Sequence, residues 1–236
     1  MLKVIEEAGV PIDYIAGTSF GAILGGVYAT GYRAAQLDSL FRAGLWRTDN
    51  VMELLDRLTG TGDWVDYHAL AIPFRCVAVD LNTQEEVVFR HGNMALAMRA
   101  SMAIPGAYKP VLIDGRTLVD GGMVNNLPVD VVKAMGADIV IAIDLTQNKH
   151  KTREFSLRDK IGIGGLLDWV VSRPDWRKYN ENRLAADLYI NPDLKGYGAA
   201  SFTEKSVAEM MRIGEEEARR QMTQLRAIST RAKEGI

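Results

Sequence analysis

The sequence predicts an α/β fold, in which short strands alternate with helices. Residues 138–143 form an apolar run without polar alternation, which is typical of a strand covered on both faces in a parallel sheet. Residues 14–16 form a second apolar strand that leads through a glycine-rich turn into a helix. The composition, 47% hydrophobic and 25% charged, is that of a globular chain. The 236 residues contain no internal repeat or clear linker, so we expect one domain over residues 1–236.

The first half of the chain alternates between helical and extended patterns. Residues 1–9 resemble the end of a helix that Gly9 terminates. A strand at 14–16, a turn at 17–21 and helices at 22–30 and about 33–44 follow. A hairpin is expected over residues 74–90 around a turn at 82–84, and a helix over residues 93–102.

The second half begins with the strongest turn signal in the chain. Asp114-Gly115 lies between two β-rich runs, 111–113 and 117–119, and predicts a tight hairpin. Pro128 is placed to open a helix that ends at Gly136. The spacing of Ser201 and Glu204 predicts a capping box at the start of one long terminal helix.

Charge and cysteine content exclude several functional classes. The chain has 28 Lys and Arg against 30 Asp and Glu, a net charge of −2, which gives no support to nucleic-acid binding. The single cysteine, Cys76, excludes an internal disulfide and a multi-cysteine zinc site. The three histidines lack the helical spacing of metal ligands, so we do not expect a zinc site. We also expect no cofactor.

Two segments bear on membranes and export. The opening residues are charged and do not form the apolar core of a signal peptide. Residues 14–32 carry no charge, but five of these 19 residues are glycine, so we expect a strand, a turn and a buried helix and no membrane span. The segment 149–183 is locally basic and interleaved with apolar residues. It is either a lid or lipid-surface contact, or an ordinary solvated helix.

The segment 17–21 matches the pattern G-x-S-x-G between a strand and a helix. We expect positions 17 and 21 to require glycine, because side chains there would collide with the adjoining strand and helix. Ser19 would then lie at the helix N-terminus as a nucleophile, with the backbone N–H of Phe20 as a candidate oxyanion donor. The alternative is a glycine-rich packing turn in which the serine is only an N-cap.

A serine hydroxyl needs a base to become nucleophilic. The three histidines, His68, His91 and His150, do not stand at strand ends that face a motif. A carboxylate is therefore the candidate base. Asp120 ends a predicted strand, and Gly121-Gly122 lets the backbone turn away, but sequence order alone does not separate this Asp-Gly pair from Asp114-Gly115.

Residues 15–22 and 119–122 together resemble the patatin-like phospholipase family. Further similar stretches extend the likeness over nearly the whole chain: 73–81, 100–106, 125–129 and 193–197. The resemblance implies a three-layer α/β/α sandwich with a mostly parallel central sheet. It also implies a catalytic dyad of Ser19 and Asp120, with Gly17, Gly21, Gly121 and Gly122 shaping the two turns.

One departure from the family qualifies this expectation. The resemblance implies a first strand and a glycine-rich oxyanion loop ahead of the opening helix, and we expect both to be missing from this sequence. Loss of one oxyanion donor costs about 10²–10³ in rate. A catalytically impaired binding or interaction domain is therefore the alternative to an enzyme, and a histidine-dependent serine hydrolase is a third reading.

The sequence thus predicts a lipid acyl hydrolase, of phospholipase A or lipase type, that works through an acyl-enzyme. Its expected partner is a phospholipid or another lipid ester, with possible contact to a membrane surface and none to nucleic acid. The resemblance includes bacterial members, both cytoplasmic and exported, so the compartment stays open, as does the oligomeric state.

Overall fold

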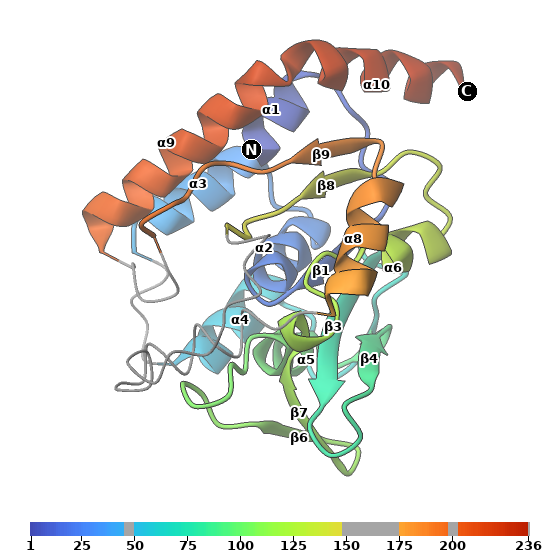
Figure 1. Ribbon diagram of the computed structural model, residues 1–236. Helices are drawn as coiled ribbons and strands as arrows, with labels where there is room; N and C mark the ends of the chain where they lie inside the picture. The colour runs from blue at the N-terminus through green and yellow to red at the C-terminus, as the bar shows by residue number, and fades with distance from the viewer. Residues whose placement is uncertain (45–49, 148–174, 198–202, 236) are drawn as a thin grey trace, which may run out of the picture.

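The computed structural model describes residues 1–44, 50–147, 175–197 and 203–235 (Figure 1). Helices cover both sides of the strands, and the predicted α/β/α class is confirmed. The strands are β1 (Ile15–Thr18), β2 (Val65–Asp66), β3 (Phe74–Asp80), β4 (Glu86–Phe89), β5 (His91–Gly92), β6 (Val111–Ile113), β7 (Arg116–Asp120), β8 (Ile141–Ile143) and β9 (Leu188–Ile190).

The helices that the structure describes begin and end close to glycine and capping residues. They are α1 (Leu2–Glu7), α2 (Phe20–Ala29), α3 (Ala34–Arg42), α4 (Val51–Thr59), α5 (Met94–Ser101), the 3₁₀ turn η2 (Gly121–Met123), α6 (Val129–Ala134), α8 (Trp176–Ala185), α9 (Glu204–Arg220) and α10 (Met222–Glu234). Asn50, Asn93 and Asp175 accept backbone N–H bonds and cap α4, α5 and α8.

The strands form a larger sheet, a parallel pair and a small ribbon. In the larger sheet β1 runs parallel to β3, while β3 pairs antiparallel with both β4 and β7, and β7 with β6. The second parallel pair is β8 with β9, and the short strands β2 and β5 pair antiparallel. The parallel pairing of β1 and β3 brings the C-terminal end of β1 beside the middle of β3, where the end of β7 also lies.

Apolar side chains hold the layers together on both sides of the strands. On one side α2, α4 and α5 pack against β3 through a fully buried cluster that includes Leu55, Phe74 and Met98. On the other, α6 and α8 pack with β8 through Val129, Val140 and Tyr179. The helices α1, α9 and α10 form a third cluster with β9.

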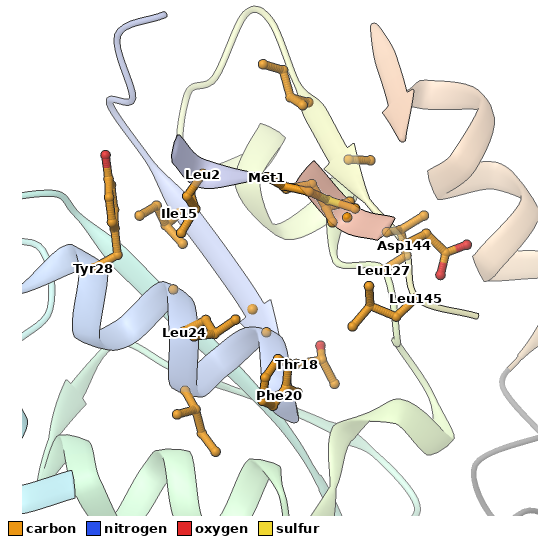
Figure 2. Close-up of a pocket in the computed structure, with 18 of the residues that line it drawn as sticks. Met1, Leu2, Ile15, Thr18, Phe20, Leu24, Tyr28, Leu127, Asp144 and Leu145 are labelled. Carbon is orange, nitrogen blue, oxygen red and sulfur yellow. The ribbon is translucent and has the colours of Figure 1, made fainter. Parts of the chain in front are cut away.

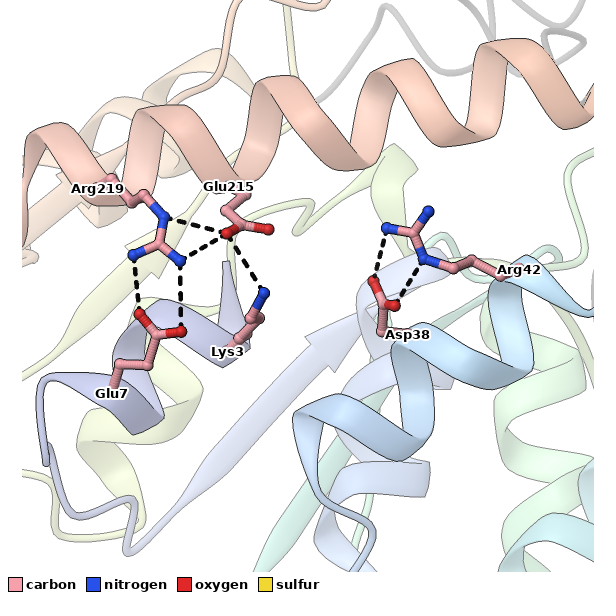
Figure 3. A network of polar contacts seen from close by, with 6 residues as sticks. All are labelled: Lys3, Glu7, Asp38, Arg42, Glu215 and Arg219. Carbon is pink, nitrogen blue, oxygen red and sulfur yellow. Dashed lines mark hydrogen bonds and ion pairs between the residues drawn. The ribbon is translucent and has the colours of Figure 1, made fainter.

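The helices α1 and α9 lie side by side, as Figure 3 shows. Arg219 of α9 binds Glu7 of α1 at 2.8 Å and Glu215 at 2.6 Å, and Lys3 approaches Glu215 at 3.5 Å. These ion pairs are exposed, and exposed pairs contribute little. Burial of Leu225 and Ile228 against α1 is the larger stabilising contribution to this contact.

A groove of about 2370 Å³ separates the two parallel pairs of strands. The residues of β1 line one wall and those of β8 the other (Figure 2). Among the described residues β1 pairs only with β3, and β8 only with β9, so each strand presents its other edge without a strand partner.

Most of the predicted elements are present, with shifted ends. The hairpins at 74–90 and 111–119 are confirmed, and Asp114 and Gly115 adopt the positive φ angles, 50° and 75°, of a type I′ turn. The prediction of a single long terminal helix is wrong, because α9 ends and α10 begins at Gln221. Its described cap is Thr203, which forms a capping box with Ser206, whereas Ser201 lies outside the described residues.

Two predictions concern membranes. Within the described part of the chain, every helix is too short or too polar to cross a bilayer. Of the basic segment 149–183, residues 149–174 lie outside the described residues, and the remainder contributes α8, which begins at Trp176.

Candidate active site

Ser19 lies on a sharp turn between β1 and α2. Its φ and ψ angles are 54° and −121°, a region that L-residues rarely adopt and that costs about 1–3 kcal/mol. A Cβ on Gly17 would lie 2.4 Å from the Gly21 carbonyl oxygen, so only glycine fits at position 17. The turn therefore projects a half-buried hydroxyl from the start of a helix.

The expected steric need for glycine at position 21 is wrong. A Cβ on Gly21 would meet nothing within 4 Å, and the residue is exposed. The reason is that Gly21 lies in the first turn of α2, where side chains point away from the helix axis and here toward open space. At this turn the backbone of Gly21 lies against Gly17, and this close approach is possible because Gly17 has no side chain.

Asp120 is the last residue of β7 and is 4% exposed. Its backbone N–H donates to the Ala103 carbonyl, and its Oδ1 accepts from the Gly122 N–H at 2.8 Å. A Cβ on Gly121 would lie 2.3 Å from the Val77 carbonyl oxygen, so the backbone after Asp120 presses directly on β3. Gly122 is less constrained, because its nearest contacts would be the side chains of Asn126 and Asp120.

The structure brings Ser19 and Asp120 into direct contact across 101 residues of sequence. The Ser19 hydroxyl donates to Asp120 Oδ2 at 2.6 Å, with no residue between them. Burial raises the pKa of Asp120 to about 6, although the hydrogen bonds from Ser19 and Gly122 oppose the shift. A carboxylate with this pKa is a better proton acceptor than a solvated aspartate and is ionised at neutral pH.

The other candidate aspartate and the histidines lie elsewhere. Asp114 is exposed in the β6–β7 turn, at the opposite end of β7 from Asp120. His68 follows β2, and His91 stacks on Trp64 with ring centroids 6.0 Å apart. Neither of these two histidines lines the groove that contains Ser19 and Asp120, and His150 lies outside the described residues.

A buried polar network beneath the two turns was not anticipated as functional. The Thr18 hydroxyl donates to the Asn125 carbonyl at 2.7 Å, which ties the residue before Ser19 to the loop after Asp120. The Asn125 amide donates to Glu86 at 2.7 Å and to Asp130 at 2.8 Å. Asn125 belongs to one of the stretches that carried the family resemblance, but its partners are 5 to 107 residues away and follow no local pattern.

Lys178 of α8 completes this network. Its ammonium group contacts Glu86 at 2.5 Å and Asp130 at 3.0 Å. Partial burial raises the pKa of Asp130, but hydrogen bonds from Asn125, Lys178 and Asn182 outweigh it and leave the pKa below its usual value. The loop that follows Asp120 is thereby fixed to β4 and α8.

Neither a reactive thiol nor a metal-binding cluster is found among the described residues. Cys76 is fully buried, and burial raises the pKa of its thiol to about 12, so it is not a reactive nucleophile. Within the described residues no group of three or more His, Cys, Asp and Glu side chains is arranged to hold a metal ion.

The wall of the groove near Ser19 is mainly apolar. Figure 2 shows Phe20 and Leu24 of α2 beside Thr18, with Leu127 and Leu145 across the groove. Asp144 also lines it, and its carboxylate accepts hydrogen bonds from Tyr179 and Tyr189, each at 2.5 Å. The arrangement can seat an apolar group beside a serine hydroxyl, a buried carboxylate and a helix N-terminus.

Comparison with known proteins gives a consistent family. A family model described as patatin-like phospholipase matches residues 1–87 and 39–133, which together exceed half of the chain. The chain is 33% identical over 233 residues to lysophospholipase NTE1 of Mycosarcoma maydis. It is 35% identical over 165 residues to the human patatin-like phospholipase domain-containing protein 6, and 34% identical over 161 residues to an uncharacterized NTE family protein of Mycobacterium tuberculosis.

These relatives are longer than the matched region. The alignments cover 90%, 61% and 61% of this chain, but 12%, 12% and 44% of the fungal, human and mycobacterial proteins respectively. The chain thus spans less than half the length of these relatives.

Proposed function

The chain belongs to the patatin-like phospholipase family, and from this we propose that it hydrolyses carboxylic esters of lipids with Ser19 as nucleophile and Asp120 as base. The observation that supports this most strongly is the 2.6 Å hydrogen bond from the Ser19 hydroxyl to Asp120. It has the direction that proton transfer requires, because the serine is the donor and the carboxylate the acceptor.

In the proposed reaction, Ser19 Oγ attacks the ester carbonyl carbon while its proton passes to Asp120. The C–O bond of the tetrahedral intermediate then breaks, Asp120 protonates the departing alcohol, and an acyl-enzyme remains. Water attacks this acyl group, with Asp120 accepting its proton. The fatty acid leaves, and the proton returns to Ser19 Oγ.

Negative charge develops on the carbonyl oxygen during both attacks. Ser19 precedes α2, so the partial positive charge of the helix N-terminus faces that oxygen, and we place the backbone N–H of Phe20 among its donors. Each donor of this kind contributes about 10²–10³ in rate.

The apolar wall formed by Phe20, Leu24, Leu127 and Leu145 supports an acyl chain as the group held next to Ser19. The relatives, which include a lysophospholipase, support a phospholipid or lysophospholipid as the ester. A lipid substrate would be reached at a membrane or micelle surface, so we include peripheral contact with lipid in the proposal.

The proposal is tested with a fluorophosphonate probe and with hydrolysis of a soluble medium-chain ester. The protein should be labelled, and Ser19→Ala and Asp120→Asn should each abolish labelling and lower hydrolysis by at least about 10³-fold. Asp114→Asn is the matched control, since it changes the other Asp-Gly pair at an exposed turn and should leave both rates unchanged.

Two outcomes would overturn the assignment in different ways. Hydrolysis that survives in Ser19→Ala would remove the nucleophile. A wild-type protein that neither reacts with the probe nor hydrolyses esters, although folded, would favour the binding-domain alternative.

A further inference from the structure

We propose that Ser101 is a positioning residue for the Ser19–Asp120 pair: its hydroxyl fixes the backbone of Ser19 and thereby sets the direction of the nucleophile. The inference rests on the proposed function. Ser101 Oγ accepts the Ser19 backbone N–H at 2.8 Å and donates to the Val77 carbonyl at 2.6 Å. The hydroxyl thus links the nucleophile turn to the central strand β3.

Ser101 itself has no access to substrate. It is the last residue of α5 and is 0% exposed. Its hydroxyl accepts one hydrogen bond from a backbone N–H and donates one to a backbone carbonyl, and it also interacts with the buried Cys76 thiol. A buried hydroxyl with one donor and one acceptor partner has a defined orientation, and removing it would leave a buried N–H and a buried C=O each without this partner.

The anchored residue is the one that most needs an anchor. Ser19 has a φ of 54°, one of three positive values among the described non-glycine residues. Such a conformation persists only where surrounding contacts hold it. Relaxation of this φ would rotate the Ser19 side chain, so the hydrogen bond to its N–H is also a constraint on Oγ.

The same end of α5 also holds the base. The Ala103 carbonyl, two residues after Ser101, accepts the backbone N–H of Asp120 at 3.1 Å. Ser101 and Ala103 therefore fix Ser19 and Asp120 to one short, buried segment. Since general-base catalysis requires the hydroxyl and the carboxylate within about 3 Å, small shifts of this segment change the rate more than the affinity.

Ser229 provides a matched control. It is also a buried helical serine, 4% exposed, and its hydroxyl donates to the Gly9 carbonyl at 2.6 Å, the same length as the Ser101–Val77 bond. Ser101→Ala and Ser229→Ala each remove one hydrogen bond from a serine hydroxyl to a backbone carbonyl. Only the first also removes the acceptor of the Ser19 N–H.

The test combines a catalytic and a non-catalytic measurement on the full chain. Ser101→Ala should slow fluorophosphonate labelling and lower kcat for a soluble ester by at least about tenfold, with KM changed less than about twofold. By NMR, the Ser19 amide should exchange its hydrogen about tenfold faster, the factor expected for loss of one hydrogen bond. Ser229→Ala should leave the labelling rate, kcat, KM and the Ser19 amide exchange rate unchanged, although it lowers the Tm. Ser101→Cys, which keeps the volume and weakens the acceptor, should fall between Ser101→Ala and the wild type.

The outcomes separate this inference from the proposed function. Wild-type labelling with an equal rate in Ser101→Ala would overturn the positioning role and leave the enzyme assignment intact. An unchanged Ser19 amide exchange in both Ser101 variants would also overturn it. If the wild type failed to label, the proposed function would be rejected and the catalytic part of the inference with it, while the exchange rates would still decide whether Ser101 holds Ser19.

Discussion

Gly17 and Gly21 lie so close together that a Cβ atom on Gly17 would stand 2.4 Å from the Gly21 carbonyl oxygen. The reverse is not true, since a Cβ on Gly21 would have open space. The two glycines of one motif therefore have different physical roles, although the sequence pattern treats them alike.

This asymmetry predicts different tolerance to alanine. Gly17→Ala forces the β1–α2 turn apart, and we expect it to destabilise the protein by roughly 2–4 kcal/mol and to abolish probe labelling. Gly21→Ala should fold with an unchanged or slightly higher Tm, because alanine is favoured over glycine in a helix. Thermal unfolding and labelling of both variants check this, and equal destabilisation by the two changes would contradict it.

The sequence predicted the features that depend on local pattern. The turn around Ser19, the turn after Asp120 and both hairpins depend on glycine and aspartate at fixed short spacing, which limits the backbone whatever surrounds it. The equal treatment of Gly17 and Gly21 failed because only the packed structure shows which side of the turn is crowded.

The contacts of Ser101 and Asn125 were not predicted, for a different reason. Their partners are 82 and 107 residues away in the chain, and a serine or asparagine at a helix end or loop is too common to signal such a contact. The break between α9 and α10 at Gln221 was also not predicted, because no proline or glycine marks it in the sequence.

The rate of esterolysis should follow the ionisation of Asp120. Burial raises the pKa of this carboxyl to about 6, and the base must be ionised to accept the serine proton. We expect kcat/KM for a neutral ester to be level above about pH 7 and to fall about tenfold per unit below about pH 6. A variant in which His68, His91 and His150 are all changed to Gln should give the same profile. A shift or loss of the inflection in that variant would favour a histidine base.

Removal of the Asp120 charge should stabilise the fold at neutral pH. The folded-state pKa of about 6 lies above the ordinary 3.8, so the native state binds more protons than the unfolded state between about pH 4 and 6. Stability contributed by this group is therefore complete below pH 4 and lost as the pH rises through 6. A difference of about two pKa units corresponds to roughly 3 kcal/mol.

Asp120→Asn does not ionise and should escape that loss. Its free energy of unfolding, measured in urea, should rise relative to the wild type by roughly 2 kcal/mol between pH 4.5 and 7.5, since roughly 1 kcal/mol of the total is already lost at pH 4.5. Asp114→Asn should follow the wild type at both pH values, because the Asp114 carboxyl is exposed. If the free energies of unfolding of Asp120→Asn and the wild type differed by the same amount over this pH range, the pKa of Asp120 would not be raised by folding.

Lys178 should contribute more to the free energy of unfolding than an ordinary surface lysine, because it holds the loop after Asp120. Its side chain is 24% exposed and neutralises two carboxylates, Glu86 and Asp130, which share Asn125 as a hydrogen-bond donor. Lys178→Met removes the cation and leaves both carboxylates close together, so we expect a loss of roughly 1–3 kcal/mol at pH 7. Because hydrogen bonds from Asn125, Lys178 and Asn182 hold the pKa of Asp130 below its ordinary 3.8, this loss should persist at pH 4.5 and shrink only below about pH 4.

The control is Lys195→Met. Lys195 is 77% exposed and makes a 3.6 Å ion pair with Asp193, so its removal should leave the urea midpoint unchanged. Lys178→Met should also slow probe labelling of Ser19, since the network it closes includes Asn125, whose carbonyl accepts the Thr18 hydroxyl beside the nucleophile. Destabilisation without slower labelling would mean that this network supports the fold alone. An unchanged urea midpoint in Lys178→Met would mean that its two ion pairs are as weak as the one at Lys195.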